Sequence, residues 1–298
     1  MKRQMPSGGK APAPGAEFPF NTREGREAIL ATYDRLTARW PVSFQQRTVP
    51  TSLGAASAIE WGSPEHPVLV LVHGSSSNAA TWLGDAAAYG ADHHVFAVDL
   101  PGECGRSDPR RPVLEGAAYA AWLGEVIDSL VPGNEPIRLV GMSLGGWVSM
   151  QYAFRYAERV EKLGLLCPAG LGPIRRSFLL LAIISGLMGD AGKKRLIRHM
   201  AGNVPLDEEF MDFMMQITRS FQPITAPIPP LEDSELGLLT MPVRMLLGGR
   251  DTLIDSAASR KRAARLLPNA DVVWLPDASH MLVNRAGDLV PFLTEPHA

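Results

Sequence analysis

The 298-residue sequence is poor in cysteine, in excess charge and in recognisable metal motifs. Cys104 and Cys167 are too few for a disulfide framework, so we expect a reducing compartment and assign the protein to the cytoplasm. With 29 basic and 31 acidic side chains, the formal net charge of −2 gives no general electrostatic reason to bind nucleic acid. Neither an H-E-x-x-H nor a Cys-x-x-Cys motif occurs, and we predict no metal and no cofactor.

Long apolar runs are also missing. Residues 1–16 carry basic side chains with no apolar stretch after them, so we do not expect a secretory signal peptide. The most apolar segment, 178–188, is flanked by basic residues and falls short of the ~20 residues that span a bilayer, so no stable membrane insertion is predicted. We interpret it as a buried helix; a helix on a membrane surface and an apolar lid are the alternatives.

The sequence does contain 46% hydrophobic and 20% charged residues, a composition typical of a globular protein. Residues 1–20, rich in proline, glycine and alanine without periodicity, are predicted to form a mobile tail. Helical spacing predicts a helix over 23–40, and residues 42–49 and 55–61 are predicted to form a β-hairpin.

Further along the chain, short β-branched runs alternate with helical patterns. Continuous apolar strands of this kind are typical of a mostly parallel sheet covered by helices on both faces. The predicted strands are 68–72, 95–98, 137–140, 163–166, 243–247 and 272–275, and the predicted helices are 79–89, 116–130, 144–156 and 256–266.

The alternation stops over 171–239, where a mainly helical pattern separates two strands by more than a usual connection. We therefore predict a doubly wound α/β core in two parts, 21–170 and 240–298, with 171–239 as an inserted helical cap.

The chemistry is carried first by Gly141-Met-Ser-Leu-Gly145, which lies between a predicted strand and a predicted helix. A sharp strand-to-helix turn needs a strained backbone and a close crossing of the two elements, and glycine removes the side chains that would clash there. The N-terminus of the helix favours negative charge beside the exposed hydroxyl. The context predicts Ser143 as a nucleophile.

A serine hydroxyl needs a base, and the base needs an acid that fixes its tautomer. His280 follows the last predicted strand, and Asp251 follows the strand before it, with Asp255 as the rival acid. All three predicted residues then lie at the carboxyl edge of the sheet, in the order Ser, Asp, His. The other histidines lack such a position: His66, His93, His94, His199 and His297.

The negative oxygen of a tetrahedral intermediate also needs hydrogen-bond donors. We predict the backbone N–H groups of Leu144 and Ser75, the latter in the loop after strand 68–72. His73, in the same loop, is interpreted as a residue that shapes the loop rather than as the base.

In combination, these motifs resemble the α/β-hydrolase superfamily, and specifically its smaller capped carboxylesterases, over nearly the whole chain after about residue 20. The matching segments are Leu71-Val-His-Gly74, Val98-Asp-Leu-Pro-Gly102 with Gly105-Arg-Ser107, Val140-Gly-Met-Ser-Leu-Gly-Gly146, Gly248-Gly-Arg-Asp251 and Ser279-His280. Two residues depart from the family pattern, which commonly has glycine at the position of Ser279 and glutamate at that of Arg285.

The resemblance implies cofactor-free hydrolysis of a carboxylic ester, through an acyl-enzyme, with Ser143, Asp251 and His280 as the triad. We expect a small neutral or apolar ester that contacts the cap. A carbon–carbon bond hydrolase, a lactonase, a perhydrolase and an aminopeptidase remain open with the same triad. So do a lipase-like surface binder and, outside enzymes, a ligand receptor on a hydrolase fold. The oligomeric state is not predicted.

Overall fold

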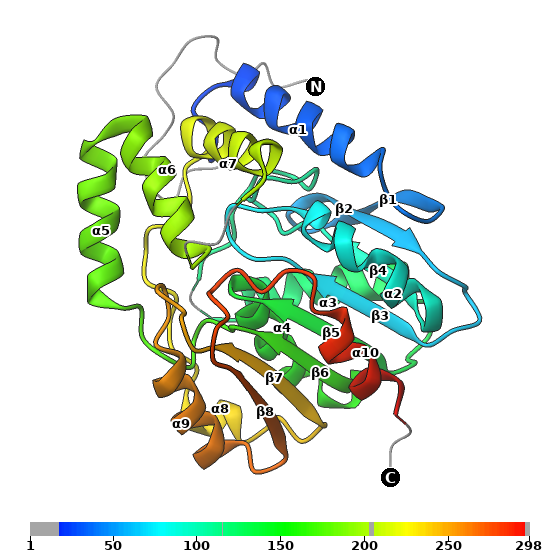
Figure 1. The fold of residues 1–298 in the computed structure, drawn as a ribbon. Helices are drawn as coiled ribbons and strands as arrows, with labels where there is room; N and C mark the ends of the chain where they lie inside the picture. Colours follow the sequence, from blue (N-terminus) through cyan, green and yellow to red (C-terminus); the bar gives the residue numbers. More distant parts are fainter. Residues whose placement is uncertain (1–17, 115, 203–205, 296–298) are drawn as a thin grey trace.

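A computed structural model describes residues 18–114, 116–202 and 206–295 (Figure 1). Within them, eight strands form a single sheet in the order β1-β2-β4-β3-β5-β6-β7-β8. The strands are β1 (Phe44–Thr51), β2 (Gly54–Trp61), β3 (Val68–Val72), β4 (His94–Val98), β5 (Ile137–Met142), β6 (Val160–Leu166), β7 (Val243–Gly248) and β8 (Ala270–Leu275). Each predicted strand corresponds to one of them.

The sheet is mostly parallel, which confirms the predicted fold class. β1 and β2 form the expected antiparallel hairpin, and β2 also pairs with β4 in the antiparallel direction. All pairs from β4 through β3, β5, β6 and β7 to β8 are parallel. The carboxyl ends of these parallel strands therefore meet at one edge, where a doubly wound sheet places its functional groups.

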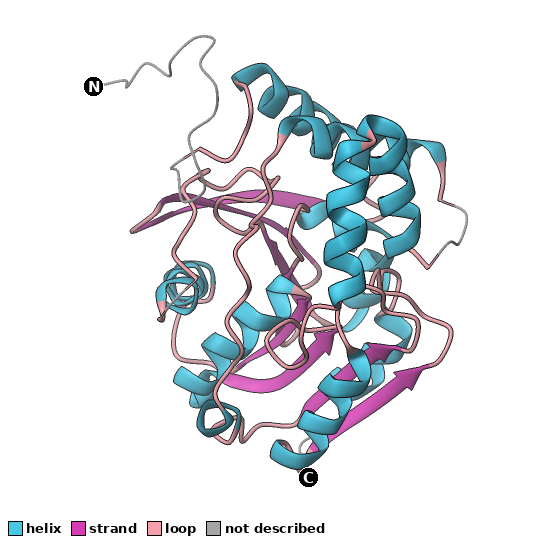
Figure 2. Cartoon of the chain, turned by 90° about the vertical axis from the view of Figure 1, so that its left-hand side faces the viewer, coloured by secondary structure: helices cyan, strands magenta, loops and turns pink. Residues whose placement is uncertain are grey.

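Helices cover both faces of the sheet (Figures 1 and 2). They are α1 (Arg23–Thr37), α2 (Ala86–Asp92), α3 (Ala118–Leu130), α4 (Leu144–Arg155), α5 (Arg176–Leu187), α6 (Gly189–Met200), α7 (Glu208–Ser220), α8 (Asp233–Leu236), α9 (Ser256–Leu266) and α10 (Ala286–Thr294). Two 3₁₀ helices, η1 (Ala79–Asp85) and η2 (Ala157–Arg159), complete the described elements.

The two faces of the sheet are packed in separate cores. On β3, Val70 and Val72 point into the core formed with α3 and α4, whereas Leu69 and Leu71 point into the core formed with α1, α2 and α10. Because side chains alternate along a strand, apolar residues at every position of β3 supply both cores at once. The continuous apolar run in the sequence is thus explained by burial on both sides.

The segment between β6 and β7 contains α5, α6, α7 and α8. Figure 1 shows α5 and α6 side by side at the outside of the molecule, with α7 between them and α1. The division of the chain into a core and a cap over 171–239 remains a prediction.

Two expectations about exposure need correction. Helix α5 falls on the predicted buried segment 178–188, yet Ser185 is its only buried residue and its apolar side chains are largely exposed. The prediction of a buried helix was wrong because hydrophobicity on all sides gives no signal of whether a partner covers the helix. The predicted tail falls mainly outside the described residues, but Phe20 at its end is buried and bridges to Phe221.

Helix α4 crosses close over β3. A Cβ atom on Gly145 would overlap the carbonyl oxygens of Val72 and His73. Both obstacles are backbone atoms, so the crossing cannot widen without moving a strand in the middle of the sheet.

We expect Gly145→Ala to lower the free energy of unfolding by about 2 kcal/mol or more, because overpacking against backbone cannot relax by a rotamer change. Gly287→Ala is the matched control: it lies in α10 and a Cβ atom there meets nothing within 4 Å. It should raise the unfolding free energy by up to about 1 kcal/mol. Urea denaturation measures both, and equal stabilities for the two variants would contradict the close crossing.

Candidate active site

Ser143 lies at the turn between β5 and α4, with a backbone φ of 51° and ψ of −112°. A non-glycine residue with positive φ is strained, and such strain is found where the surrounding structure enforces it. The enforcement here is visible: Ser143 N–H donates to Leu166 O at 2.9 Å, and Ser143 O accepts from Trp147 N and Ala169 N at 3.1 and 3.0 Å. A Cβ atom on Gly141 would overlap the carbonyl of Gly145, so the turn also requires glycine.

The three residues predicted from the sequence lie in one hydrogen-bonded row. The His280 Nε2 atom is 3.0 Å from Ser143 Oγ, and its Nδ1 atom is 2.8 Å from Asp251 Oδ2. His280 follows β8, Asp251 follows β7 and Ser143 follows β5, so parallel strands deliver all three to the same edge. The Asp251 and His280 side chains are buried, and Ser143 is half-buried at the end of the row.

The environment of Asp251 keeps its carboxyl group ionised. Burial opposes ionisation, but the hydrogen bond with His280, the charge of His280 and the N–H groups of Leu253 and Ile254 outweigh it and lower the pKa of Asp251. Asp255, the rival acid, instead caps α9 by accepting from Ala258 N at 3.2 Å. Of the two carboxylates that the sequence left as alternatives, Asp251 is therefore the one that bonds to His280, and Asp255 is not.

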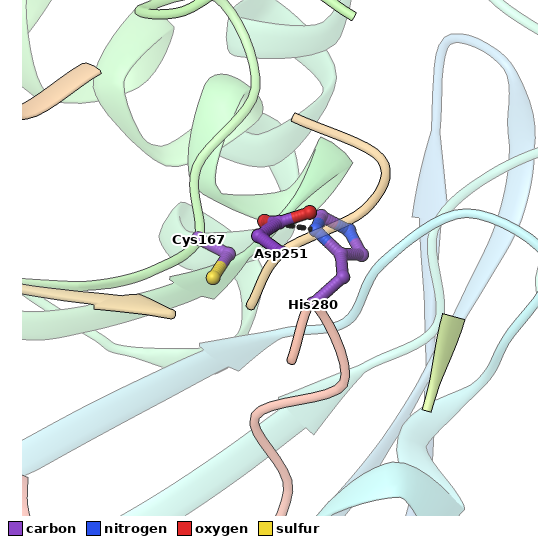
Figure 3. A group of neighbouring side chains, drawn as sticks. All are labelled: Cys167, Asp251 and His280. Atoms are coloured by element: carbon purple, nitrogen blue, oxygen red, sulfur yellow. Dashed lines mark hydrogen bonds and ion pairs between the residues drawn. The ribbon is translucent and has the colours of Figure 1, made fainter. Parts of the chain in front are cut away.

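Cys167 lies on the other side of the Asp251 carboxylate from His280 (Figure 3). Ligand atoms of these three side chains lie within 4.8 Å of one another, the spacing of a metal site. Their chemistry does not fit a metal, because burial and the neighbouring Asp251 carboxylate raise the pKa of the Cys167 thiol, whereas a metal ligand must be a thiolate. Asp251 is moreover already bonded to His280 and two backbone N–H groups.

Of the two predicted oxyanion donors, Leu144 adjoins Ser143 in the chain, and Ser75 lies one residue beyond Gly74. Leu144 is the first residue of α4, so its N–H has no acceptor within the helix. Ser75 follows Gly74, where a Cβ atom would stand 3.4 Å from the Cβ atom of Ser143. The loop after β3 therefore reaches the nucleophile, although its role in catalysis remains a proposal.

His73 fixes this loop, as the sequence predicted. Its Nδ1–H donates to Gly74 O at 2.7 Å, and its Nε2 atom accepts from Leu100 N at 2.9 Å. Burial lowers the pKa of His73 to about 4, so the neutral ring that can make both bonds is the stable form. His73 thereby joins the loops that follow β3 and β4.

Sequence reasoning missed two buried carboxylates that hold the same loop. Asp99 accepts hydrogen bonds from Ala79 N and Arg106 N, each at 2.8 Å. Glu103 accepts from Ser76 N at 2.6 Å, beside the proposed donor Ser75, and Ser76 has a positive φ of 55°. Asp99 lies in a segment that resembles the family, but no signal in the sequence marked either side chain as buried.

The other described residues singled out in the sequence lie outside the hydrogen-bonded row. Cys104 is buried, and burial raises the pKa of its thiol. Ser279, in place of the usual glycine, accepts from Met281 N at 3.3 Å, and Arg285 pairs with Asp288. His297 lies outside the described residues.

The helical insertion contacts the site directly. Arg175 Nε donates to the backbone oxygen of Asp251 at 3.0 Å, and Thr252 Oγ1 donates to His199 O at the end of α6 at 3.3 Å. A Cβ atom on Gly202 would stand 2.9 Å from Ser279 Cβ, one residue before His280. Residues 175 and 199–202 therefore form part of the rim around the catalytic candidates.

Glu103 generates a pH-dependent prediction. Burial raises the pKa of Glu103 to about 7, although the charge of Arg111 acts in the opposite direction. The folded protein therefore binds the carboxyl proton of Glu103 more tightly than the unfolded chain does. The free energy of unfolding should thus fall by about 3 kcal/mol as pH rises from about 4.5 to 7, and Glu103→Gln should remove this loss.

Denaturation of both proteins at several pH values between 5 and 8 measures the effect. Glu158→Gln, at an exposed carboxyl group where burial cannot act, is the control and should follow the wild type. Parallel curves for wild type and Glu103→Gln would refute the prediction.

Comparison with known proteins places this site in a family. The model of the alpha/beta hydrolase family matches residues 69–291. The chain is 28% identical over 260 residues to the Bacillus subtilis uncharacterized carboxylesterase nap, covering 84% of this chain and 85% of the relative. It is 27% identical over 280 residues to Bacillus subtilis carboxylesterase YbfK, covering 88% and 90%.

Among solved structures, carboxylesterase CesB (YbfK) from Bacillus subtilis superposes with a TM-score of 0.81 at 25% identity, over 92% of this chain and 100% of that one. The family match extends from β3 to α10 and includes Ser143, Asp251 and His280. The chain belongs to the alpha/beta hydrolase family.

Proposed function

We propose that the protein is a serine carboxylesterase that cleaves a small neutral ester through an acyl-enzyme. The observation that carries the proposal is the row from Ser143 Oγ through the His280 ring to Asp251, at 3.0 and 2.8 Å. Its placement on a strained turn at the N-terminus of α4 is the second support. The two Bacillus subtilis relatives described as carboxylesterases agree with it.

In the proposed acylation step, Ser143 Oγ attacks the ester carbonyl while His280 Nε2 accepts its proton. Asp251 holds Nδ1–H and stabilises the imidazolium that forms. The carbonyl oxygen becomes an oxyanion between the N–H groups of Leu144 and Ser75, and each such donor is worth roughly 3 kcal/mol of barrier. The imidazolium then protonates the leaving alcohol.

Deacylation repeats the same transfers with water as the nucleophile. His280 Nε2 takes a proton from water, the hydroxide attacks the acyl carbon, and the proton returns to Ser143 Oγ as the acid departs. Each step returns the row to its initial protonation state. Apart from the substrate and water, the scheme uses only groups of the chain.

The substrate class rests on the relatives rather than on the insertion. We expected an apolar substrate to contact the cap, but Leu179, Leu180 and Ile183 of α5 are exposed. The exposed side chains of α5 therefore do not define an acyl-binding surface. Cytoplasmic residence is also part of the proposal. As a separate finding, no helix in the described part of the chain is long and apolar enough to cross a membrane.

Turnover of short and medium p-nitrophenyl esters tests the nucleophile. Ser143→Ala should lower kcat by about 10⁶-fold, since the remaining groups cannot form the acyl-enzyme. A fluorophosphonate probe should label the wild type at Ser143, as mapped by peptide mass spectrometry, and leave the variant unlabelled. Equal rates in the two proteins would reject the proposal, and tight ester binding without turnover would favour a ligand receptor.

A matched pair of carboxylate variants tests the acid. Asp251→Asn should lower kcat by about 10⁴-fold, because the amide no longer fixes the His280 tautomer. Asp255→Asn should leave kcat within about threefold of the wild type, since asparagine also caps a helix well. Steady-state kinetics on one p-nitrophenyl ester compares them, and a larger loss at Asp255 would assign the acid role to that residue instead.

A further inference from the structure

Helix α5 exposes an unusual amount of apolar surface. Leu180, Ile183 and Leu187 are 60%, 65% and 85% exposed, and Leu179, Ile184 and Met188 are exposed as well. These six side chains, defined here as the α5 patch, fall in three pairs four residues apart, and they lie on an outer helix of the molecule or, for Met188, at its C-terminal cap (Figure 1). Contiguous apolar surface of this kind marks an interaction site in soluble proteins.

Helix α6 packs against α5. A Cβ atom on Gly192 of α6 would overlap Ser185 O, so the two helices touch backbone to backbone at this point. On its other side α6 packs through Ile197 against Met211 and Met215 of α7. The close contact holds α5 firmly in place while leaving the α5 patch uncovered.

The surroundings of the patch are strongly basic. Residues 175–200 contain six lysines and arginines and one aspartate, a net +5, in a chain with a net charge of −2. The rest of the chain therefore carries −7. Arg176, Arg195 and Arg198 are exposed, and the aspartate, Asp190, is paired with Arg219.

The basic charge and the apolar side chains together indicate which partner binds the α5 patch. A second copy would bring the same +5 segment to the interface, and like charges would oppose the contact. An acidic protein could pair with the exposed arginines, but it would also have to present an apolar face that covers the α5 patch. A lipid surface offers both at once, since its anionic headgroups lie above its acyl chains.

We propose that the α5 patch and the basic residues of α6 dock on the surface of an anionic lipid bilayer. Helix α5 has 12 residues and a length of about 18 Å, well under the ~30 Å of a hydrocarbon core, so it lies in the interface and does not span it. The other end of α6 meets Thr252 beside Asp251, so docking brings the rim of the candidate site close to the lipid.

Sedimentation of the full chain with vesicles tests the docking. Wild-type protein should bind vesicles of phosphatidylcholine with phosphatidylglycerol at least about tenfold more tightly than vesicles of phosphatidylcholine alone, and added salt should weaken this binding. Leu180→Gln/Ile183→Gln/Leu187→Gln and Arg195→Gln/Arg198→Gln should each weaken it by about tenfold or more.

Two matched double variants serve as controls. Val113→Gln/Leu238→Gln changes exposed apolar residues elsewhere, and Arg250→Gln/Lys261→Gln changes exposed cations elsewhere; both should bind like the wild type. Thermal unfolding and hydrolysis of p-nitrophenyl acetate in solution verify that the variants fold. Ser143→Ala should also bind normally, so this test is independent of the proposed esterase activity.

Three results would overturn the proposal. One is the absence of binding to the anionic vesicles. Another is equal binding by the α5 triple variant and the wild type. The last is a dimer in analytical ultracentrifugation that the triple variant abolishes, which would assign the patch to a second copy.

Discussion

The close approach of α4 to the central strands is the constraint on which the site depends. Glycines at 141 and 145 let the helix begin directly above the backbone of β3 and β5, and this position forces Ser143 into its left-handed conformation. The hydroxyl then lies at the sheet edge where β7 and β8 deliver Asp251 and His280. A wider crossing would relax the turn and also remove the hydroxyl from reach of the imidazole.

Around this turn, buried polar groups hold the loops by hydrogen bonds to backbone. Neutral His73 links the loops after β3 and β4, and Asp99 and Glu103 bind N–H groups of the segment 76–79 and of Arg106. Such groups cost free energy to bury, so their presence indicates that the loop must keep a defined shape. The burial that positions the loop is also what raises the pKa values of both carboxylates.

Much of this was predictable from the sequence because the relevant signals are local. Apolar runs followed by small residues identified the strands and their carboxyl edge, and the glycines around Ser143 identified the turn. The start of β6 was not predicted, since Glu161 and Lys162 interrupt its apolar pattern; Lys162 is buried and donates to Phe292 O at the end of α10. The exposure of α5 and the burial of Glu103 depend on tertiary packing, which periodicity does not contain.

The insertion between β6 and β7 is fastened at both of its ends. At its beginning, Ile174 bridges to Ile254, and Arg175 binds the backbone of Asp251. Towards its end, α7 is tied to the N-terminal helix by Thr32 and Gln216, and the bridge between Phe20 and Phe221 follows. A movement of the whole insertion as one rigid lid would therefore have to break attachments at two separate places, one to the loop that carries Asp251 and one to α1.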